Sequence, residues 1–196
     1  MEPVTLTTDR LVLRPFGPDD AGEVHAACQD PDIHRWTAVP SPYGREQAEG
    51  WVTEVMPRAW AEDTEYGFAV RPRGGGPLLA SVGVHVSGVP GARAYEIGYW
   101  ATREHRGRGY VSEAVTGVAR WLFTDVGAAR LQWRAEVGNT ASRAAAEKAG
   151  FRFEGTLRAA LDVRGTRRDA WVGGLLPADL GLPAPVPYLP AVSAGA

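Results

Sequence analysis

The chain has 196 residues, 44% of them hydrophobic and 22% charged, which excludes a fibrous or wholly disordered protein and suits one compact domain. Its single cysteine, Cys28, excludes an internal disulfide framework and a cysteine-based zinc site. The net charge of −2 argues against a broadly basic surface for nucleic acid, so any anion must be bound by a local feature.

The N-terminal third is predicted to contain one strand and two helices. Alternating apolar residues predict a strand at about 10–16, and a proline followed by two aspartates begins a short helix that reaches about Cys28. Three prolines predict a long loop over 29–44. Apolar residues at helical spacing predict a helix over about 45–60, which Pro57 is expected to kink or end early.

The middle of the chain is predicted to form hairpins followed by a crossover. Strand-like runs at about 65–71, 78–86 and 94–101 are separated by turns rich in glycine and proline, which predicts antiparallel pairing. A continuous apolar stripe predicts a helix over about 109–124, and alternation predicts a strand at about 130–137. A strand, a helix and a strand in this order imply a parallel pair within a mixed sheet.

The remaining elements are a short helix and a hairpin. The helix is predicted over 140–149 and ends at Gly150, a residue that tolerates the left-handed conformation common after a helix. The runs 151–163 and 166–176 predict an antiparallel pair of strands.

The two ends of the chain carry no export or membrane signal. Residues 1–9 lack a basic segment before an apolar run, and no stretch approaches ~18 apolar residues, so we expect a cytoplasmic protein. The segment 177–196 has five prolines and almost no charge. We therefore expect a single domain over 1–176 and an extended or poorly ordered tail. The four histidines share no spacing that predicts a metal site.

The segment before the helix at 109–124 carries the strongest functional signal. It reads Arg106-Gly-Arg-Gly-Tyr-Val111, and its two glycines allow a tight bend and a close approach to a ligand. The first helical turn adds unpaired N–H groups and the positive end of the helix dipole. Together with the arginines, this predicts a phosphate or diphosphate site. The alternative is a basic turn whose glycines only cap the helix.

Two other phosphate motifs do not fit this segment. It lacks the Gly-Lys-Ser/Thr of a Walker loop, and Ser112 stands where a dinucleotide fingerprint has its third glycine.

Together with several further segments, the loop instead resembles the GNAT N-acetyltransferase superfamily and is similar to its Rim-type branch of ribosomal-protein N-terminal acetyltransferases. The matching segments, in the family's order over about 8–176, are Thr8-Asp-Arg-Leu-Val-Leu-Arg14, Glu96-Ile-Gly-Tyr-Trp100, Arg106-Gly-Arg-Gly-Tyr-Val111, Asn139-Thr-Ala-Ser142, Glu147-Lys-Ala-Gly-Phe151 and Phe153-Glu-Gly-Thr-Leu-Arg158, with Asp169.

The resemblance implies a fold and an activity. The fold is α/β (α+β), a GNAT fold with a mixed, mostly antiparallel sheet of about seven strands flanked by about four helices. The activity is transfer of an acetyl group from acetyl-CoA, or another acyl group from its acyl-CoA, to the primary amine of a peptide N-terminus or small molecule. Transfer is by direct attack in a ternary complex, without metal, by a monomer or homodimer. The alternative is a non-catalytic GNAT-fold module that binds acyl-CoA as a sensor.

Candidate cofactor residues follow from the same resemblance. Backbone N–H groups over 108–112 would bind the diphosphate of coenzyme A, and the strand at 96–101 would accept the pantetheine arm as a sheet edge accepts a strand. An amide near its end would polarise the thioester carbonyl. Asn139 would contact the arm, its ordinary role being a helix N-cap. Val111 departs from the glycine or alanine of many members. The candidates are Tyr99, Trp100, Ala101, Arg106, Gly107, Arg108, Gly109, Tyr110, Val111, Ser112, Asn139 and Ser142.

Three residues are candidates for catalysis. Glu154 and Glu96 are candidate bases, which are needed because an amine attacks only when it is neutral. The ordinary role of Glu154 is an ion pair with a nearby arginine, and that of Glu96 is a surface charge. Ala146 stands where many members have a tyrosine acid, so the resemblance implies Ser142 as donor to the leaving thiolate. A thiol with a pKa of about 8.5 leaves with modest help.

Acceptor binding is assigned to the predicted loop and the terminal hairpin. Trp36, Tyr43 and Arg35 are the candidate substrate-binding residues, although loop aromatics often only cover a core. The arginines of the hairpin are candidates for an acidic acceptor or a carboxylate-bearing acyl group. They are Arg158, Arg164, Arg167 and Arg168.

Overall fold

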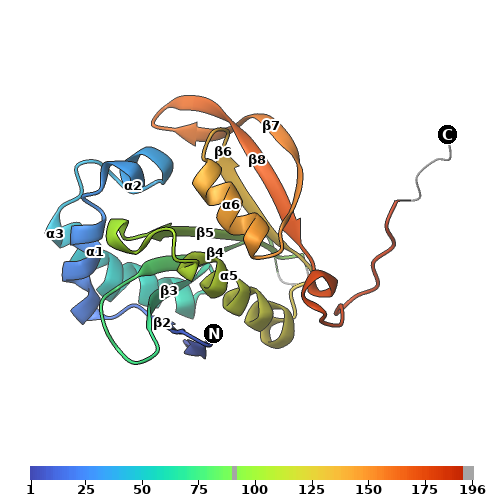
Figure 1. Cartoon of the computed structure of the whole chain (residues 1–196), viewed down its shortest axis with the longest axis horizontal. Helices are drawn as coiled ribbons and strands as arrows, with labels where there is room; N and C mark the ends of the chain where they lie inside the picture. Colours follow the sequence, from blue (N-terminus) through green and yellow to red (C-terminus); the bar gives the residue numbers. More distant parts are fainter. Residues whose placement is uncertain (90–91, 192–196) are drawn as a thin grey trace.

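The centre of the protein is one eight-stranded sheet, which the computed structural model describes together with its helices over residues 1–89 and 92–191. The strand order is β1-β2-β3-β4-β5-β6-β8-β7 (Figure 1). Only β5 and β6 run parallel, and every other neighbouring pair is antiparallel. The predicted mixed sheet is confirmed, with a short strand, β1, in addition. The strands are β1 (Leu6–Thr7), β2 (Leu11–Pro15), β3 (Glu65–Pro72), β4 (Ala80–Ser87), β5 (Ala94–Ala101), β6 (Leu131–Glu136), β7 (Arg152–Val163) and β8 (Thr166–Leu175).

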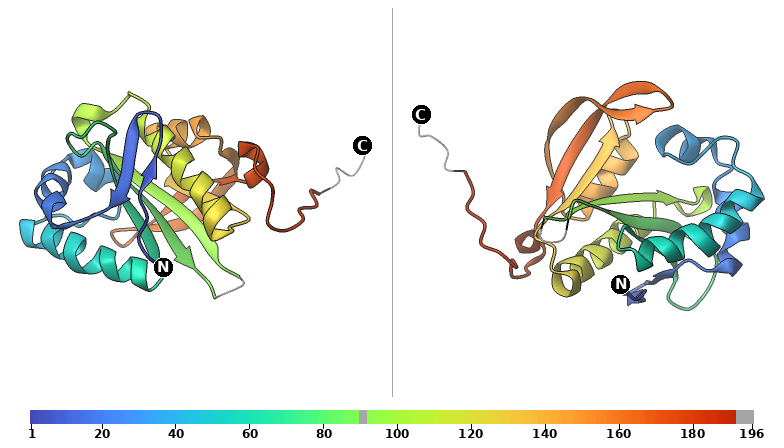
Figure 2. Two further views of the ribbon diagram at one scale, coloured as in Figure 1. Left: turned by 90° about the horizontal axis from the view of Figure 1, so that it is seen from below. Right: turned by 180° about the vertical axis from the view of Figure 1, so that it is seen from behind.

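Helices cover both faces of the sheet. The stretch of α3 and α4 lies on the opposite face from α5 (Figure 2). A π-helical turn at Trp51–Val55 joins α3 to α4, and the helix continues past Pro57 to Ala61, so the proline does not end it. The helices are α1 (Ala21–Ala27), α2 (Pro31–Trp36), α3 (Arg45–Gly50), α4 (Met56–Ala61), α5 (Tyr110–Trp121) and α6 (Thr140–Lys148).

The strand alternation sends side chains into two separate cores. On β3, Phe68 points into the core under α5 and α6, while the next residue, Ala69, points into the core under α1 to α4. Both cores exclude water from large apolar side chains, which is the main stabilising term for a sheet covered on two faces. The sheet is therefore packed against apolar side chains on both faces.

The main irregularity is the separation of β5 from β6. The two strands pair only at Glu96 with Gln132 and at Ile97 with Trp133. Beyond these pairs, β6, β7 and β8 leave the plane of the other strands, and the gap opens toward α2 and α6 (Figure 1). Parallel strands that part in this way leave backbone N–H and C=O groups without a strand partner.

The predicted loop at 29–44 is partly wrong, because it contains α2. Asp30 caps this helix, since its side chain accepts a hydrogen bond of 2.9 Å from the Asp32 amide, and Pro31 occupies the first turn. Proline is favoured there because its missing N–H would have no partner in any case. The proline that predicted a loop is thus part of a helix start.

The predicted tail is also corrected at its beginning. Pro177 is buried and starts a 3-10 helix, η5 (Pro177–Leu180), and both Leu180 and Leu182 pack against the core. Chain beyond the predicted domain limit at 176 thus contributes to the fold, and only the later residues up to 191 extend away from it (Figure 1). The tail's last residues, 192–196, and two residues of the turn predicted after β4, 90–91, lie outside the described residues.

Within residues 1–89 and 92–191, no helix has the length and apolar character required to cross a membrane.

Candidate functional site

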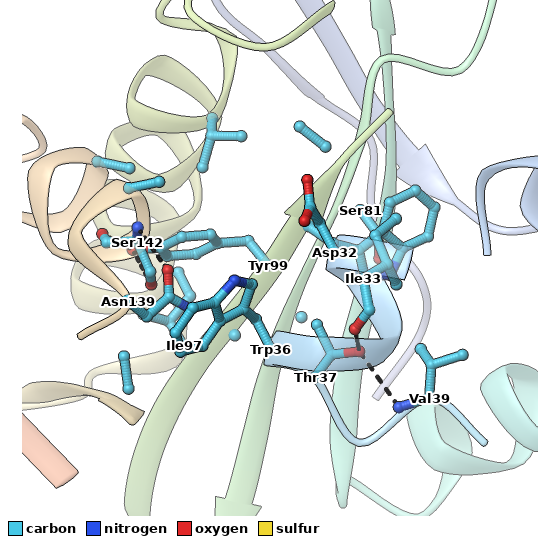
Figure 3. A pocket seen from close by; sticks show the side chains of 18 of the residues that line it. Asp32, Ile33, Trp36, Thr37, Val39, Ser81, Ile97, Tyr99, Asn139 and Ser142 are labelled. Carbon is cyan, nitrogen blue, oxygen red and sulfur yellow. Dashed lines mark hydrogen bonds between the residues drawn. The ribbon is translucent and has the colours of Figure 1, made fainter. Parts of the chain in front are cut away.

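A cleft of about 910 Å³ opens where β5 and β6 separate. Figure 3 views it between side chains of α2, which include Asp32 and Trp36, and a group around Tyr99 and Ser142. The glycine loop at 106–111 lines it, and so do Ser81, Gly83 and His85 along one face of β4. The cleft therefore combines the predicted diphosphate loop with the residues predicted to bind an acceptor.

The glycine loop has the conformation that its sequence predicts. Gly107 and Gly109 have φ angles of +75° and +77°, in the left-handed region that other residues enter only with strain. Gly109 is the N-cap of α5, and the first turn of this helix has N–H groups without intrahelical partners. Backbone groups at this end of the cleft can therefore hold an anion, as predicted.

Two cations above this loop escaped the sequence analysis. A Cβ at Gly109 would stand 3.3 Å from Lys148 Nζ and 3.6 Å from Arg10 Nη2. Arg10 is held in place by Glu113, with Nε 2.6 Å from Oε2, and its Nη1 donates to the Arg108 carbonyl. Their only signal was that both belong to segments that match the family. They add positive charge next to the loop.

Arg106 has a different role from the predicted one. Its guanidinium lies 2.7 Å from Asp30 Oδ2 and 2.9 Å from Asp32 Oδ2, and its Nε donates to the Ala101 carbonyl. The Asp30 side chain is 8% exposed, whereas those of Arg106 and Asp32 are 34% and 64% exposed. The side chain ties the loop to α2 and is not free for a phosphate, although its backbone remains part of the loop.

A hydrogen-bonded group occupies the side of the cleft next to α6. Trp133 Nε1 donates to Ser142 Oγ (3.0 Å), Ser142 Oγ donates to Tyr99 Oη (3.3 Å), and Tyr99 Oη donates to the Ser142 carbonyl (2.7 Å; Figure 3). Burial raises the pKa of Tyr99 to about 12, so its hydroxyl stays protonated. Asn139 caps α6 by accepting from the Ser142 amide (3.1 Å). The family resemblance implied a role for the backbone near Tyr99 only, and no signal in the sequence pointed to its hydroxyl.

The two candidate bases lie in different places. Glu96 is on β5 directly before the cleft residues Ile97 and Gly98, and its Oε2 accepts from Arg134 Nε at 2.7 Å. Glu154 lies outside the cleft lining. Its carboxylate is 41% exposed and accepts two hydrogen bonds from Arg130, which lower its pKa. Glu154 thus forms the ion pair that was its ordinary alternative, and its role as a base stays a prediction that its position outside the cleft does not support.

The predicted acceptor residues differ in what they offer to the cleft. Trp36 lines it, with the guanidinium of Arg35 stacked 4.0 Å from the centre of its ring. Arg35 is also bound to Glu136 by two hydrogen bonds of 2.8 Å, which bridge α2 to β6. Tyr43 is mostly buried, and this burial raises its pKa to about 12. Arg164 of the hairpin donates to the His34 carbonyl, so it closes the hairpin onto α2.

The sequence model of the acetyltransferase (GNAT) domain matches residues 10–152 of this chain. The chain belongs to this family. Curated relatives named as N-acetyltransferases agree with the match, so the GNAT resemblance inferred from the loop and its companion segments is confirmed. The protein is therefore a GNAT N-acetyltransferase.

Relatives of this GNAT protein are found by sequence and by structure. YoaA, an uncharacterized N-acetyltransferase of Bacillus subtilis (strain 168), is 29% identical over 164 residues, covering 84% of this chain and 92% of YoaA. The ribosomal-protein-S5-alanine acetyltransferase of Vibrio fischeri is 17% identical, with a TM-score of 0.75, covering 88% of this chain and 96% of that one. RimL, a ribosomal L7/L12 α-N-protein acetyltransferase solved with coenzyme A, is 16% identical, with a TM-score of 0.77, covering 88% and 98%. At these identities the two structures establish the shared fold.

Proposed function

We propose that this acetyltransferase moves an acetyl group from acetyl-CoA to the primary amine of a peptide N-terminus, by direct attack while both substrates are bound. The observation that carries the proposal is that the glycine loop and the α2 wall border the same cleft, at the point where β5 and β6 separate. A cofactor lying along β5 and a peptide entering past α2 would meet there. A small-molecule amine is the second acceptor class.

The cofactor end supports binding of acetyl-CoA mainly through backbone groups. The loop amides and the first turn of α5 would hold the diphosphate, with Lys148 and Arg10 adding charge. Along β5, a Cβ at Gly98 would have no neighbouring atom within 4 Å, so the pantetheine arm and the thioester have room. Backbone N–H groups near Tyr99 would stabilise the oxyanion that forms on attack.

Direct transfer is favoured over an acyl-enzyme. The chain has one cysteine, Cys28, which is 2% exposed and does not line the cleft. Burial raises the pKa of its thiol to about 11, so it is neither ionised at neutral pH nor accessible to a thioester.

The leaving sulfur would receive its proton from the group beside α6. Ser142 Oγ is within the cleft, and Trp133 Nε1 holds it in position. Since its bond to Tyr99 Oη is long, at 3.3 Å, the Ser142 hydroxyl can turn to the sulfur at little cost. Tyr99, whose hydroxyl stays protonated, would hold the serine in place through its hydrogen bond to the Ser142 carbonyl, and water would return the proton to Ser142.

The acceptor class is inferred from the relatives and from charge. Proteins with this fold include acetyltransferases named for ribosomal proteins, which have peptide amines as acceptors. Asp32 and Glu65 line the cleft and would favour the approach of an ammonium group. The cytoplasmic location and the monomeric or dimeric state stay predictions.

The test is the release of coenzyme A from acetyl-CoA, followed with a thiol reagent. We expect faster release with short peptides that begin with serine, alanine or methionine, and no increase with the same peptides acetylated at their N-terminus. Spermidine and free lysine test the small-molecule class. If calorimetry detects binding of acetyl-CoA but no amine raises release above that in water, the non-catalytic module is the better description.

A further inference from the structure

The face of the sheet that looks into the acceptor end of the cleft is ordered in cross-strand rows. The register of β3, β4 and β5 places one charged row beside one row of glycines. The charged row is Glu65, His85 and Glu96, and the glycine row is Gly67, Gly83 and Gly98.

Each charged side chain of this row is fixed by a neighbour. His85 Nδ1 lies 3.2 Å from Glu65 Oε2. The other oxygen of Glu65 stands 2.9 Å from where a Cβ of Gly83 would be, so the carboxylate occupies space that only glycine leaves. On the other side, Glu96 is bound to Arg134. The row is therefore carboxylate, imidazole, carboxylate and guanidinium across four strands.

The imidazole of His85 can accept a proton from a molecule in the cleft. Because Nδ1 faces Glu65, it carries the hydrogen in the neutral ring, and Nε2 is left as the acceptor. The residue lines the cleft and its side chain is 61% exposed, so a substrate or water can reach it. Gly98 is its diagonal neighbour on β5, and no atom of the described residues lies within 4 Å of where a Cβ of Gly98 would be. An amine above Gly98 would be within reach of Nε2, directly or through one water.

The charges around His85 suit proton acceptance near neutral pH. Its hydrogen bond with Glu65 raises the pKa of His85 above its usual 6.5; partial burial opposes this rise, and the charges of Glu65 and Glu96 add to it. A base works best when its pKa is near the working pH. The carboxylate of Glu96, by contrast, already accepts a hydrogen bond from Arg134 Nε.

We propose that His85 is a catalytic base for the acceptor amine, that Glu65 positions it, and that the two flanking carboxylates select a cationic acceptor. This inference rests on the proposed function. The ammonium form loses a proton to His85 Nε2, and the neutral nitrogen then bonds to the thioester carbonyl carbon. The carbon–sulfur bond breaks with its electron pair on sulfur, and the amide nitrogen releases its second proton to solvent. Sulfur gains a proton from the Ser142 hydroxyl, which in turn takes up, through water, the proton that the amide nitrogen releases.

The first test replaces the imidazole with an amide. We expect His85→Gln to lower kcat with the serine-, alanine- and methionine-initiated peptides by about a hundredfold, within the range for acid–base catalysis, with the KM for acetyl-CoA unchanged. In the wild type, kcat should fall as the pH decreases through the pKa of His85, and this decline should disappear in the variant. His25→Gln, on α1 and outside the cleft lining, is the matched control and should keep both the rate and the profile.

The second test keeps the imidazole and changes its partner. Glu65→Gln should move the acidic decline of kcat to lower pH and lower its plateau by about tenfold, because the neutral amide no longer raises the pKa of His85. A purely structural role for Glu65 would lower stability without moving the profile. Glu65→Gln also tests the role of His85 as the base if His85→Gln fails to fold.

The outcomes separate this inference from the proposed function. Absence of peptide turnover in the wild type overturns both. Turnover in the wild type with the rate and pH profile of His85→Gln unchanged, or an unmoved profile in Glu65→Gln, overturns the role of His85 alone.

Discussion

The two ends of the cleft are built in different ways. The cofactor end depends on backbone conformation: two left-handed glycines, the start of α5 and the open edge of β5. The acceptor end depends on side chains from α2 and the sheet face, and the β7–β8 hairpin contacts α2 from outside the cleft lining. Its walls are joined by pairs distant in sequence, such as Arg35 with Glu136 and Arg164 with the His34 carbonyl. One end is thus set locally, while the other exists only after the chain has folded.

The largest loss of activity among the following variants is expected at Ser142, where the two ends of the cleft meet. Ser142→Ala should lower kcat by about ten- to a hundredfold, because the leaving thiolate loses its donor, while the KM for acetyl-CoA stays within about twofold. Steady-state rates of coenzyme A release measure both. Ser142→Thr keeps a hydroxyl for Trp133 and should recover most of the rate; equal loss in both variants would contradict the donor role.

The backbone character of the cofactor end is tested at Gly109. Gly109→Ala should weaken acetyl-CoA binding by about tenfold or more, because a Cβ strains a φ of +77° and crowds Lys148. Calorimetry gives the affinity. Gly127→Ala is a matched control, since its φ of +78° carries the same strain with no atom within 4 Å and no place in the cleft. Similar loss of affinity in both would show that general instability is the cause.

The contribution of charge to the same end is tested at Lys148. Lys148→Met should weaken acetyl-CoA binding by about three- to tenfold at low salt, and by less at high salt, because exposed charges are screened. Affinities over a series of salt concentrations check this. Arg120→Met, on α5 and outside the cleft lining, serves as the control for lost positive charge.

A variant of Arg106 distinguishes the predicted contact with a phosphate from the observed ion pairs with Asp30 and Asp32. Arg106→Ala should raise the KM of the peptide acceptor about threefold, because α2 loses its tie to the loop, and should leave the affinity for acetyl-CoA nearly unchanged. Separate titrations of the two substrates measure this. The opposite result, weaker acetyl-CoA binding alone, would restore the phosphate role that the sequence predicted.

The smallest effect is expected at Glu154. Glu154→Gln should leave kcat unchanged and lower stability by less than about 1 kcal/mol, as an exposed ion pair does. Arg130 lowers the pKa of Glu154 in the folded state, so its stabilising effect is full above the unfolded pKa, near 4.5, and disappears as the pH falls through the lower folded value. Denaturation curves at neutral and acidic pH should therefore differ between variant and wild type only at neutral pH. A large loss of kcat would return Glu154 to catalysis.

The sequence predicted best where a local pattern has a single physical meaning. The two glycines of the loop, the stripe of α5 and the cap at Asn139 each require only neighbouring residues, and all three appear as expected. It failed where a residue type has two meanings. Pro31 is compatible with a loop or with the first turn of a helix, and Glu154 with a base or with one partner of an ion pair. For each residue, the neighbours in the chain do not decide between the two alternatives.

The sequence by itself determined most of the strands and helices in their order, the parallel strand pair and the bend of the glycine loop, because periodicity and glycine conformation are properties of short segments. Only the tertiary structure decided which charges face each other. Arg106 lies 76 residues from Asp30, and His85 meets Glu65 only through strand register. Each charged side chain had several possible partners in the chain, and the folded distances between elements selected among them. Those distances are set by packing of the two cores, which no local pattern encodes.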